Sequence, residues 1–274
     1  MAPERARSCR PTAGGFTLVE LLVVISIMSM VMAITLPALN SSREQGKRVT
    51  CLSNLRGLTQ GWTMYAMENG EKLCSGDTNW DVPPKSHWVA DGPYIPGNTV
   101  GGTAQAIRNG VLWPYVGETL DMYRCKSDRS KRLRSYAIAE SMNGMAMDTP
   151  TFPTYFRLSD IRFASQRMAF IDAECEIPWI DGPFPLPKVD DTGQIRGWWL
   201  GPRHTITGRH SNGCNISFVD GHVEYLKYRD PETVAWLRRK GPLGAIDNAD
   251  ARQISVWTPH WKFTEMGSKD TGVE

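Results

Sequence analysis

Apolar and polar positions divide the chain into an early stretch that is apolar on every side and a longer remainder with mixed patterning. Residues 16–36 contain one formally charged side chain, Glu20. A helix of that length spans roughly 31 Å at about 1.5 Å per residue, which matches the ~30 Å hydrocarbon core of a bilayer. The pattern therefore predicts a membrane-spanning helix.

The helical pattern continues beyond the apolar run. Pro37 should kink the helix, and Ser41-Ser42-Arg43-Glu44 has the spacing of a capping box that restarts it on the aqueous side. We expect one long, kinked helix that ends near Met67 and is held by packing on a globular head. Its buried stripe should comprise the apolar residues that recur at three- and four-residue steps: Leu52, Leu55, Leu58, Trp62, Tyr65 and Ala66.

A β-hairpin is the clearest local structure in the second half of the chain. Asp220-Gly221 separates two alternating runs within residues 215–225, which predicts a two-residue turn. That register places Val219 opposite His222. It also places four apolar side chains on one face, namely Ile216, Phe218, Val223 and Tyr225.

Shorter patterns complete the expected fold, which is α+β with the long helix packed on a small antiparallel sheet. Residues 136–138 and 167–171 should be strands, and residues 111–115 a short helical turn. Asp230 should cap a helix that begins at Pro231. Residues 177–201, rich in proline and tryptophan, are interpreted as a surface insertion without assigned structure.

The residues before the apolar run and Glu20 within it narrow the class of protein. Residues 1–15 carry three Arg against Glu4, as in leaders that stay in the cytoplasm. A secretory signal peptide fits poorly, because the run is longer than about 15 residues and lacks an A-x-A-like cleavage site. A simple anchor leaves Glu20 unexplained, since a carboxylate in hydrocarbon costs roughly 2.5 to 3.5 kcal/mol.

Gly15-Phe16-Thr17-Leu18-Val19-Glu20 resembles the prepilin peptidase site of type IV pilins and pseudopilins. The resemblance implies cleavage between Gly15 and Phe16 and N-methylation of Phe16. It also implies that Glu20 pairs with the terminal amine of a neighbouring subunit during assembly, and that Pro37 is the family's helix kink. A carboxylate and an ammonium that meet in low dielectric relieve each other's desolvation.

Further motifs are similar to a bacterial group of prepilin-type proteins with a C-terminal H-x9-D-G motif. Here that motif is His210, Asp220 and Gly221. Three other blocks resemble the same group: Cys51-Leu52-Ser53-Asn54-Leu55-Arg56, Leu112-Trp113-Pro114-Tyr115-Val116 and Cys125-Lys126-Ser127-Asp128. Lys126 stands where the group usually has proline.

These resemblances imply a pseudopilin of a type II secretion system or a type IV pilus-like assembly, with no catalytic residues. Its partners would be prepilin peptidase, other subunits through the N-terminal helix, and an inner-membrane assembly platform. The chain would cross the bacterial inner membrane once, with its head on the periplasmic or extracellular side. The expected parts are a leader (1–15), a membrane helix (16–39), its amphipathic continuation (40–70) and a head (71–274) that contains the motif region 210–221.

Charge and chemistry exclude several other classes. Beyond the leader the chain has 28 basic and 28 acidic residues, so nothing favours a nucleic-acid partner. The basic run at residues 126–134 is interrupted by Asp128 and is interpreted as a solvated loop. Phosphate-loop and hydrolase motifs are absent. His210, Asp220 and His222 are residue types that suit an acid/base or metal site. Asp220 is interpreted as a turn residue and His222 as lying on the polar face of the hairpin, which argues against such a site.

Metal and disulfide chemistry receive little support from residue spacing. No C-x-x-C occurs, and no metal site is expected apart from calcium in the head, with oxygen ligands from Asp77, Asp81 or Asp128. Loss of the leader would leave five cysteines, an odd number: Cys51, Cys74, Cys125, Cys175 and Cys214. If the head lies outside the cytoplasm, a disulfide between Cys51 and Cys125 is expected.

A rival interpretation keeps the membrane anchor but assigns a different task. Trp198 and Trp199, in the insertion, could stack on a glycan or another polymer at the cell surface. The chain would then use a pilin-type signal only for anchoring. A tryptophan-rich core or interface explains the same residues, so the sequence alone leaves both uses open.

Overall fold

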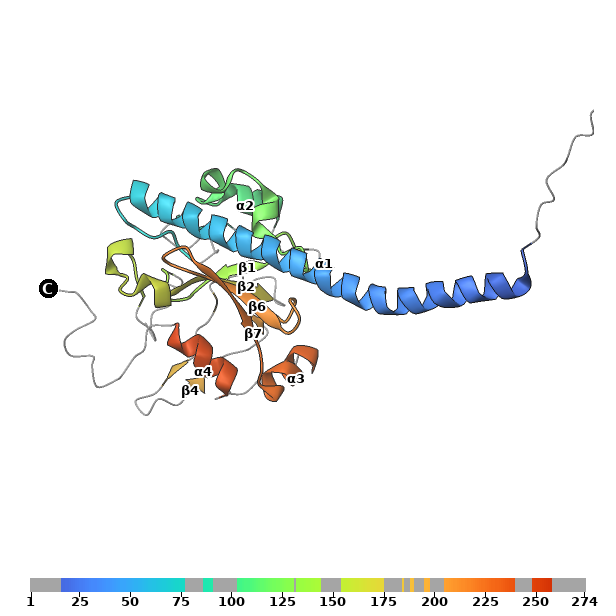
Figure 1. The fold of residues 1–274 in the computed structure, drawn as a ribbon. Helices are drawn as coiled ribbons and strands as arrows, with labels where there is room; N and C mark the ends of the chain where they lie inside the picture. The colour runs from blue at the N-terminus through green and yellow to red at the C-terminus, as the bar shows by residue number, and fades with distance from the viewer. Residues whose placement is uncertain are drawn as a thin grey trace, which may run out of the picture. The chain divides into compact units, whose positions relative to one another are not determined.

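The computed structural model describes residues 16–76, 86–90, 103–130, 132–143, 154–174, 184, 188–189, 195–197, 205–239 and 248–257. The chain divides into two compact units, residues 1–43 and residues 44–274. Helix α1 (Leu18–Glu68) contributes to both units, and it ends one residue beyond the predicted Met67. Figure 1 shows it as one long ribbon.

The first part of α1 is exposed along its whole length. Every residue from 16 to 43 is exposed, and the helix is long and apolar enough to cross a membrane. The predicted restart at residues 41–44 is wrong, because the helix runs through them without a break. The Ser42 hydroxyl instead donates to the Ala38 carbonyl at 3.0 Å, one turn back. Pro37 lies inside α1, and the kink there stays a prediction.

An antiparallel sheet forms the centre of the head, with strand order β1-β2-β6-β7 and with β5 also paired to β2 (Figure 1). The predicted strands at 136–138 and 167–171 are confirmed as β1 and most of β2. A separate antiparallel pair, β3 and β4, lies within the proline-rich stretch. The bounds are Tyr136–Ile138 (β1), Met168–Glu174 (β2), Lys188–Val189 (β3), Ile195–Gly197 (β4), Thr205–Ile206 (β5), Gly213–Phe218 (β6) and Val223–Lys227 (β7).

Short helices surround this sheet. The expected turn at 111–115 forms a 3-10 helix, η1. The bounds of the short helices are Ala104–Asn109 (α2), Trp113–Val116 (η1), Leu120–Tyr123 (η2), Leu158–Asp160 (η3), Ala164–Gln166 (η4), Pro231–Arg239 (α3) and Ala249–Val256 (α4). The predicted start of α3 is confirmed. Pro231 is its first residue, and Asp230 Oδ1 accepts the Glu232 backbone N–H at 2.9 Å.

The second part of α1 packs on the head through the predicted stripe. Leu55, Leu58, Trp62 and Ala66 are fully buried, whereas Leu52 and Tyr65 lie at the margin of the contact. The buried Thr59 hydroxyl donates to Ser217 Oγ on β6 at 2.7 Å, so α1 lies directly on the sheet. Gly61 allows close approach elsewhere, because a Cβ there would lie 2.6 Å from Val116 Cγ1.

The β6–β7 hairpin forms, but its predicted register is wrong by one residue. Ser217 pairs with Val223, and Phe218 N–H donates to the His222 carbonyl at 2.9 Å. The loop therefore has three residues and ends at Gly221, whose φ of 92° lies in the left-handed region that glycine tolerates. The one-residue difference puts Ile216 and Phe218 on the opposite face from Val223 and Tyr225, rather than all four together.

Candidate functional site

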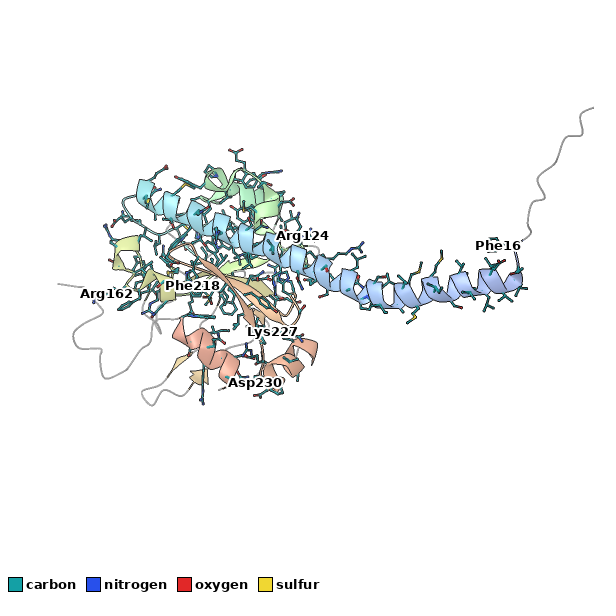
Figure 2. All side chains as sticks on the ribbon, in the orientation of Figure 1. Phe16, Arg124, Arg162, Phe218, Lys227 and Asp230 are labelled. Atoms are coloured by element: carbon teal, nitrogen blue, oxygen red, sulfur yellow. The ribbon has the colours of Figure 1, made fainter. Side chains whose placement is uncertain are left out.

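The N-terminal turn of α1 presents large apolar side chains that are exposed and have no packing partner among the described residues. Phe16 is 76% exposed and Leu18 is 79% exposed, and the apolar residues that follow are exposed as far as Leu39. Figure 2 shows Phe16 at the start of this helix, with side chains projecting along its length. An apolar surface of this extent needs lipid or neighbouring helices around it.

Glu20 is held by the first turn of its own helix. Its carboxylate accepts hydrogen bonds from the Thr17 backbone N–H at 2.8 Å and the Thr17 hydroxyl at 2.7 Å. The Glu20 backbone N–H donates back to Thr17 Oγ1 at 3.2 Å. This reciprocal arrangement is a capping box. Its T-x-x-E spacing is visible in the sequence at residues 17–20, although a capping box was predicted only at residues 41–44. Glu20 therefore satisfies helix donors locally as well as carrying charge.

A second candidate site lies buried in the head, where three distant segments meet. It contains Cys51 from α1, Cys125 from the loop after η2, and His210 from the loop before β6, all buried. The two Sγ atoms lie 2.9 Å apart as free thiols, and Cys125 Sγ lies 3.3 Å from His210 Nε2. One ligand atom from each residue falls within 4.8 Å of the others, which is compact enough for one metal ion.

Carboxylates face both nitrogens of His210. Glu44 Oε1 lies 2.9 Å from Nδ1 and also accepts the Ser127 hydroxyl at 2.6 Å. Asp172 Oδ2, from the centre of the sheet, lies 3.5 Å from Nε2. Asp172 is fully buried, and its Oδ2 has no hydrogen-bond partner among the residues that the structure describes. An orphaned buried carboxylate oxygen beside two thiols and an imidazole is a feature that calls for an explanation.

Arg209 neutralises the carboxylates on the far side of this cluster. Its Nη1 contacts Asp172 Oδ1 at 2.6 Å, and its Nη2 contacts Asp128 Oδ2 at 3.2 Å. Asp128 also accepts the Ser135 hydroxyl at 2.5 Å. The Asp128 carboxylate therefore pairs with a guanidinium, and calcium in the head stays a prediction. The other two expected calcium ligands, Asp77 and Asp81, lie outside the described residues.

The protonation states follow from burial and from these contacts. Burial raises the pKa of Asp172 to about 6, although Arg209 and His210 oppose the shift. Burial lowers the pKa of His210, but hydrogen bonding to Cys51 and the negative charge of Asp172 raise it overall. The hydrogen bond between the two thiols lowers the pKa of Cys51 and raises that of Cys125.

The residues of the H-x9-D-G motif do not form one site. His210 lies before β6, whereas Asp220 and Gly221 lie in the turn after it, as predicted for Asp220. Asp220 Oδ1 lies 2.6 Å from His222 Nδ1, and the His222 ring stacks on Phe218 with centroids 4.1 Å apart. The prediction that His222 lies on a polar face is therefore wrong. The motif therefore joins His210, which is buried beside two cysteines, to a hairpin turn.

Several residues singled out in the sequence lie outside the described residues. They are Gly15 on the leader side of the cleavage site, Cys175, and the tryptophan pair Trp198 and Trp199. The remaining described cysteines, Cys74 and Cys214, are buried free thiols whose pKa values are raised by burial. The structure brings together Cys51, Cys125 and His210, which spacing alone did not connect.

Comparison with known proteins identifies the N-terminal segment. The family model for the prokaryotic N-terminal methylation motif matches residues 10–36. The chain is 28% identical over 110 residues to the type II secretion system core protein G of Klebsiella michiganensis, covering 37% of this chain and 78% of that protein. No solved structure matches. Together the two matches support placing the chain in the type IV pilin and pseudopilin superfamily.

The superfamily assignment agrees with the geometry of α1. A methylation motif that covers residues 10–36 and so includes the first part of one long apolar helix indicates a protein anchored in the membrane by a single span. The matches point to a structural, pseudopilin-type role rather than to an enzyme.

Proposed function

We propose that this chain is a pseudopilin that is cleaved after Gly15, methylated at Phe16 and assembled through α1 into a type II secretion or pilus-like filament. The observation that carries the proposal is an exposed apolar helix whose first part lies within a matched methylation motif. A helix whose apolar residues are exposed on every side is stable only in lipid or among other helices. The relative named as a type II secretion core protein supports the same role.

Charge at the N-terminus supports one orientation of the span, although Arg43, Lys47 and Arg48 follow it on the other side. The leader carries three arginines, which favours retaining it on the cytoplasmic side and placing the head on the periplasmic side. Prepilin peptidase would act at the membrane, and an inner-membrane platform would collect the processed subunits. Glu20 would then guide each subunit into register, because its carboxylate is costly in hydrocarbon until it meets the amine of a neighbouring Phe16.

The capping box allows the charge of Glu20 to be tested apart from its hydrogen bonds. Glutamine also serves at the third position of a capping box, so Glu20→Gln retains the contacts to Thr17 and removes the charge. Thr17→Val is the matched control, since it removes the capping hydroxyl and retains the charge. We expect Glu20→Gln to be processed normally but to lose assembly, and Thr17→Val to assemble.

Two measurements on the same cells separate the steps. Intact mass of membrane-extracted protein reports cleavage and methylation, and crosslinking between neighbouring α1 helices reports assembly. Wild-type levels of crosslinked oligomer in Glu20→Gln would refute the pairing role. Loss of assembly in Thr17→Val with Glu20→Gln unaffected would assign Glu20 to helix capping alone.

A further inference from the structure

We propose that Cys51, Cys125, His210 and Asp172 form a zinc-binding site in the head. The donor atoms are two sulfurs, the Nε2 of an imidazole and one carboxylate oxygen, a set that suits tetrahedral Zn²⁺. The ligand atoms of Cys51, Cys125 and His210 already lie within 4.8 Å of one another. Asp172 Oδ2 completes the set, because it is buried, lacks a hydrogen-bond partner and lies 3.5 Å from His210 Nε2.

The surrounding contacts orient each donor as metal sites require. Glu44 Oε1 engages His210 Nδ1 at 2.9 Å, which leaves Nε2 facing the sulfurs in a carboxylate–histidine arrangement. Arg209 holds Asp172 Oδ1 at 2.6 Å, which leaves Oδ2 directed at the cluster. The Ser127 backbone N–H donates to Cys125 Sγ at 3.4 Å. His210 and Asp172 therefore each have one atom held by a neighbour and another left for an ion, and the Ser127 N–H orients the sulfur of Cys125.

The distances need only small adjustments to accept the ion. Zn–S bonds of about 2.3 Å at tetrahedral angles separate two sulfurs by about 3.8 Å, and a sulfur and a nitrogen by about 3.5 Å. The present separations are 2.9 Å for Sγ–Sγ and 3.3 Å for Cys125 Sγ to His210 Nε2. Movements of under about 1 Å, within reach of small side-chain rotations, produce the required shape.

A disulfide between Cys51 and Cys125 is the competing outcome for the same pair of thiols. A disulfide accounts for the two sulfurs, but it does not use His210 Nε2 or the orphaned Asp172 Oδ2. A bound zinc ion uses all four groups and also shields the thiolates from oxidation. Residue spacing could not reveal the site, because Cys125 is 74 residues from Cys51 and 85 from His210.

Zinc at this position would tie four parts of the head together. The ligands come from α1, from the loop after η2, from the loop before β6 and from β2, so the ion would link the helix to the sheet and to both loops. Binding to the folded head alone raises its stability by mass action. The inference is independent of filament assembly, since every ligand belongs to the unit 44–274.

The test uses the full chain, extracted from membranes in detergent without chelator or reductant. We expect about one zinc ion per chain by elemental analysis, in keeping with one four-coordinate site. Replacement by Co²⁺ should give thiolate charge-transfer absorption and the visible bands of tetrahedral cobalt. Cys125→Ser and His210→Gln should lose the zinc, whereas Cys214→Ser, a buried free thiol elsewhere in the head, should keep it.

Two results would overturn the proposal. The first is wild-type protein with free thiols that takes up neither Zn²⁺ nor Co²⁺. The second is a Cys51–Cys125 disulfide in the extracted wild type, detected by mass spectrometry of non-reduced peptides. If the cysteine variants fail to fold, Asp172→Asn decides the question, because it should weaken zinc retention and alter the Co²⁺ spectrum while both thiols remain.

Discussion

The two parts of helix α1 are alike in secondary structure and opposite in environment. Residues 18–43 are exposed throughout, whereas residues 44–68 bury one face against the head. The exposed part is almost wholly apolar, with Glu20 bonded to Thr17 in its first turn. The buried part carries polar and charged residues on its outer side and an apolar stripe on its inner side.

The contrast shows that one helix can obtain its stability from two sources. The second part is held by packing within the chain, so its substitutions should change the free energy of unfolding of the head. The first part is exposed to solvent and packs on no other described part of the chain, so its substitutions should change membrane insertion and assembly. Matched pairs of substitutions, one in each part, test this division.

The largest expected effect comes from removing a buried aromatic ring. Trp62 is fully buried, and Trp62→Ala should destabilise the head by about 3 to 5 kcal/mol through lost burial and the cavity left behind. Leu22→Ala, at a position 53% exposed, should change that free energy by under about 0.5 kcal/mol. Denaturant unfolding followed by circular dichroism measures both. Similar losses in the two variants would contradict the division.

Acid should affect the head through Asp128. Burial raises the pKa of this carboxyl, but Arg209 and the Ser135 hydroxyl lower it by more, so that its pKa in the folded head lies below 3.8. The ionised Asp128 carboxylate therefore stabilises the head above pH 3.8, and this stabilisation is lost as the pH falls through the lower pKa of the folded state. Asp128→Asn should cost about 3 kcal/mol near neutral pH.

The sign of this pH dependence can be checked directly by unfolding both proteins near neutral pH and again in acid. The gap between wild type and Asp128→Asn should narrow as the pH drops below 3.8. A gap of constant size would mean that the Asp128 charge contributes nothing to stability. The helicity of residues 18–43 in detergent should not follow this titration.

Two glycines in the same helix should respond in opposite directions. At Gly61 an added Cβ would lie 2.6 Å from Val116 Cγ1, so Gly61→Ala should destabilise the head by about 1 to 3 kcal/mol. At Gly46 nothing lies within 4 Å, so Gly46→Ala should stabilise the helix by up to about 1 kcal/mol. Thermal unfolding of both variants is the measurement. Equal shifts in one direction would show that packing does not distinguish the two positions.

The smallest effect concerns two hydroxyls with different partners. Thr59 Oγ1 donates to Ser217 Oγ across to the sheet, so Thr59→Val should cost about 1 kcal/mol. Ser26 Oγ donates to the Leu22 carbonyl within the exposed part of the helix, so Ser26→Ala should leave the head unchanged. Chemical denaturation at high precision is needed here. A larger loss for Ser26→Ala than for Thr59→Val would reverse the expected order.

Periodicity predicted the elements well because it records burial along one helix or strand. The stripe from Leu55 to Ala66, strand β1 and the Asp230 cap all follow from local residue patterns. The hairpin register failed because Asp220-Gly221 suits both a two-residue and a three-residue loop. The left-handed Gly221 and the stacking of His222 on Phe218 select the longer one.

The sites were predictable only where their residues are neighbours in the chain. The methylation motif and Glu20 are contiguous, and the first of these is matched by a known family. The T-x-x-E capping box was equally local, but Glu20 was interpreted through its charge alone. The cluster of Cys51, Cys125 and His210 depends on the tertiary fold, which brings α1 and two loops together. Without the fold, only the pairing of Cys51 with Cys125 was anticipated.

The central claim is that α1 becomes a processed, assembling helix, and the mass of the N-terminal peptide of membrane-extracted protein tests it most directly. The account predicts a chain that begins at methylated Phe16, with residues 1–15 removed. An intact Met1, or cleavage beyond residue 36, would contradict it, because Glu20 would then lie inside a leader or within a longer uncleaved anchor.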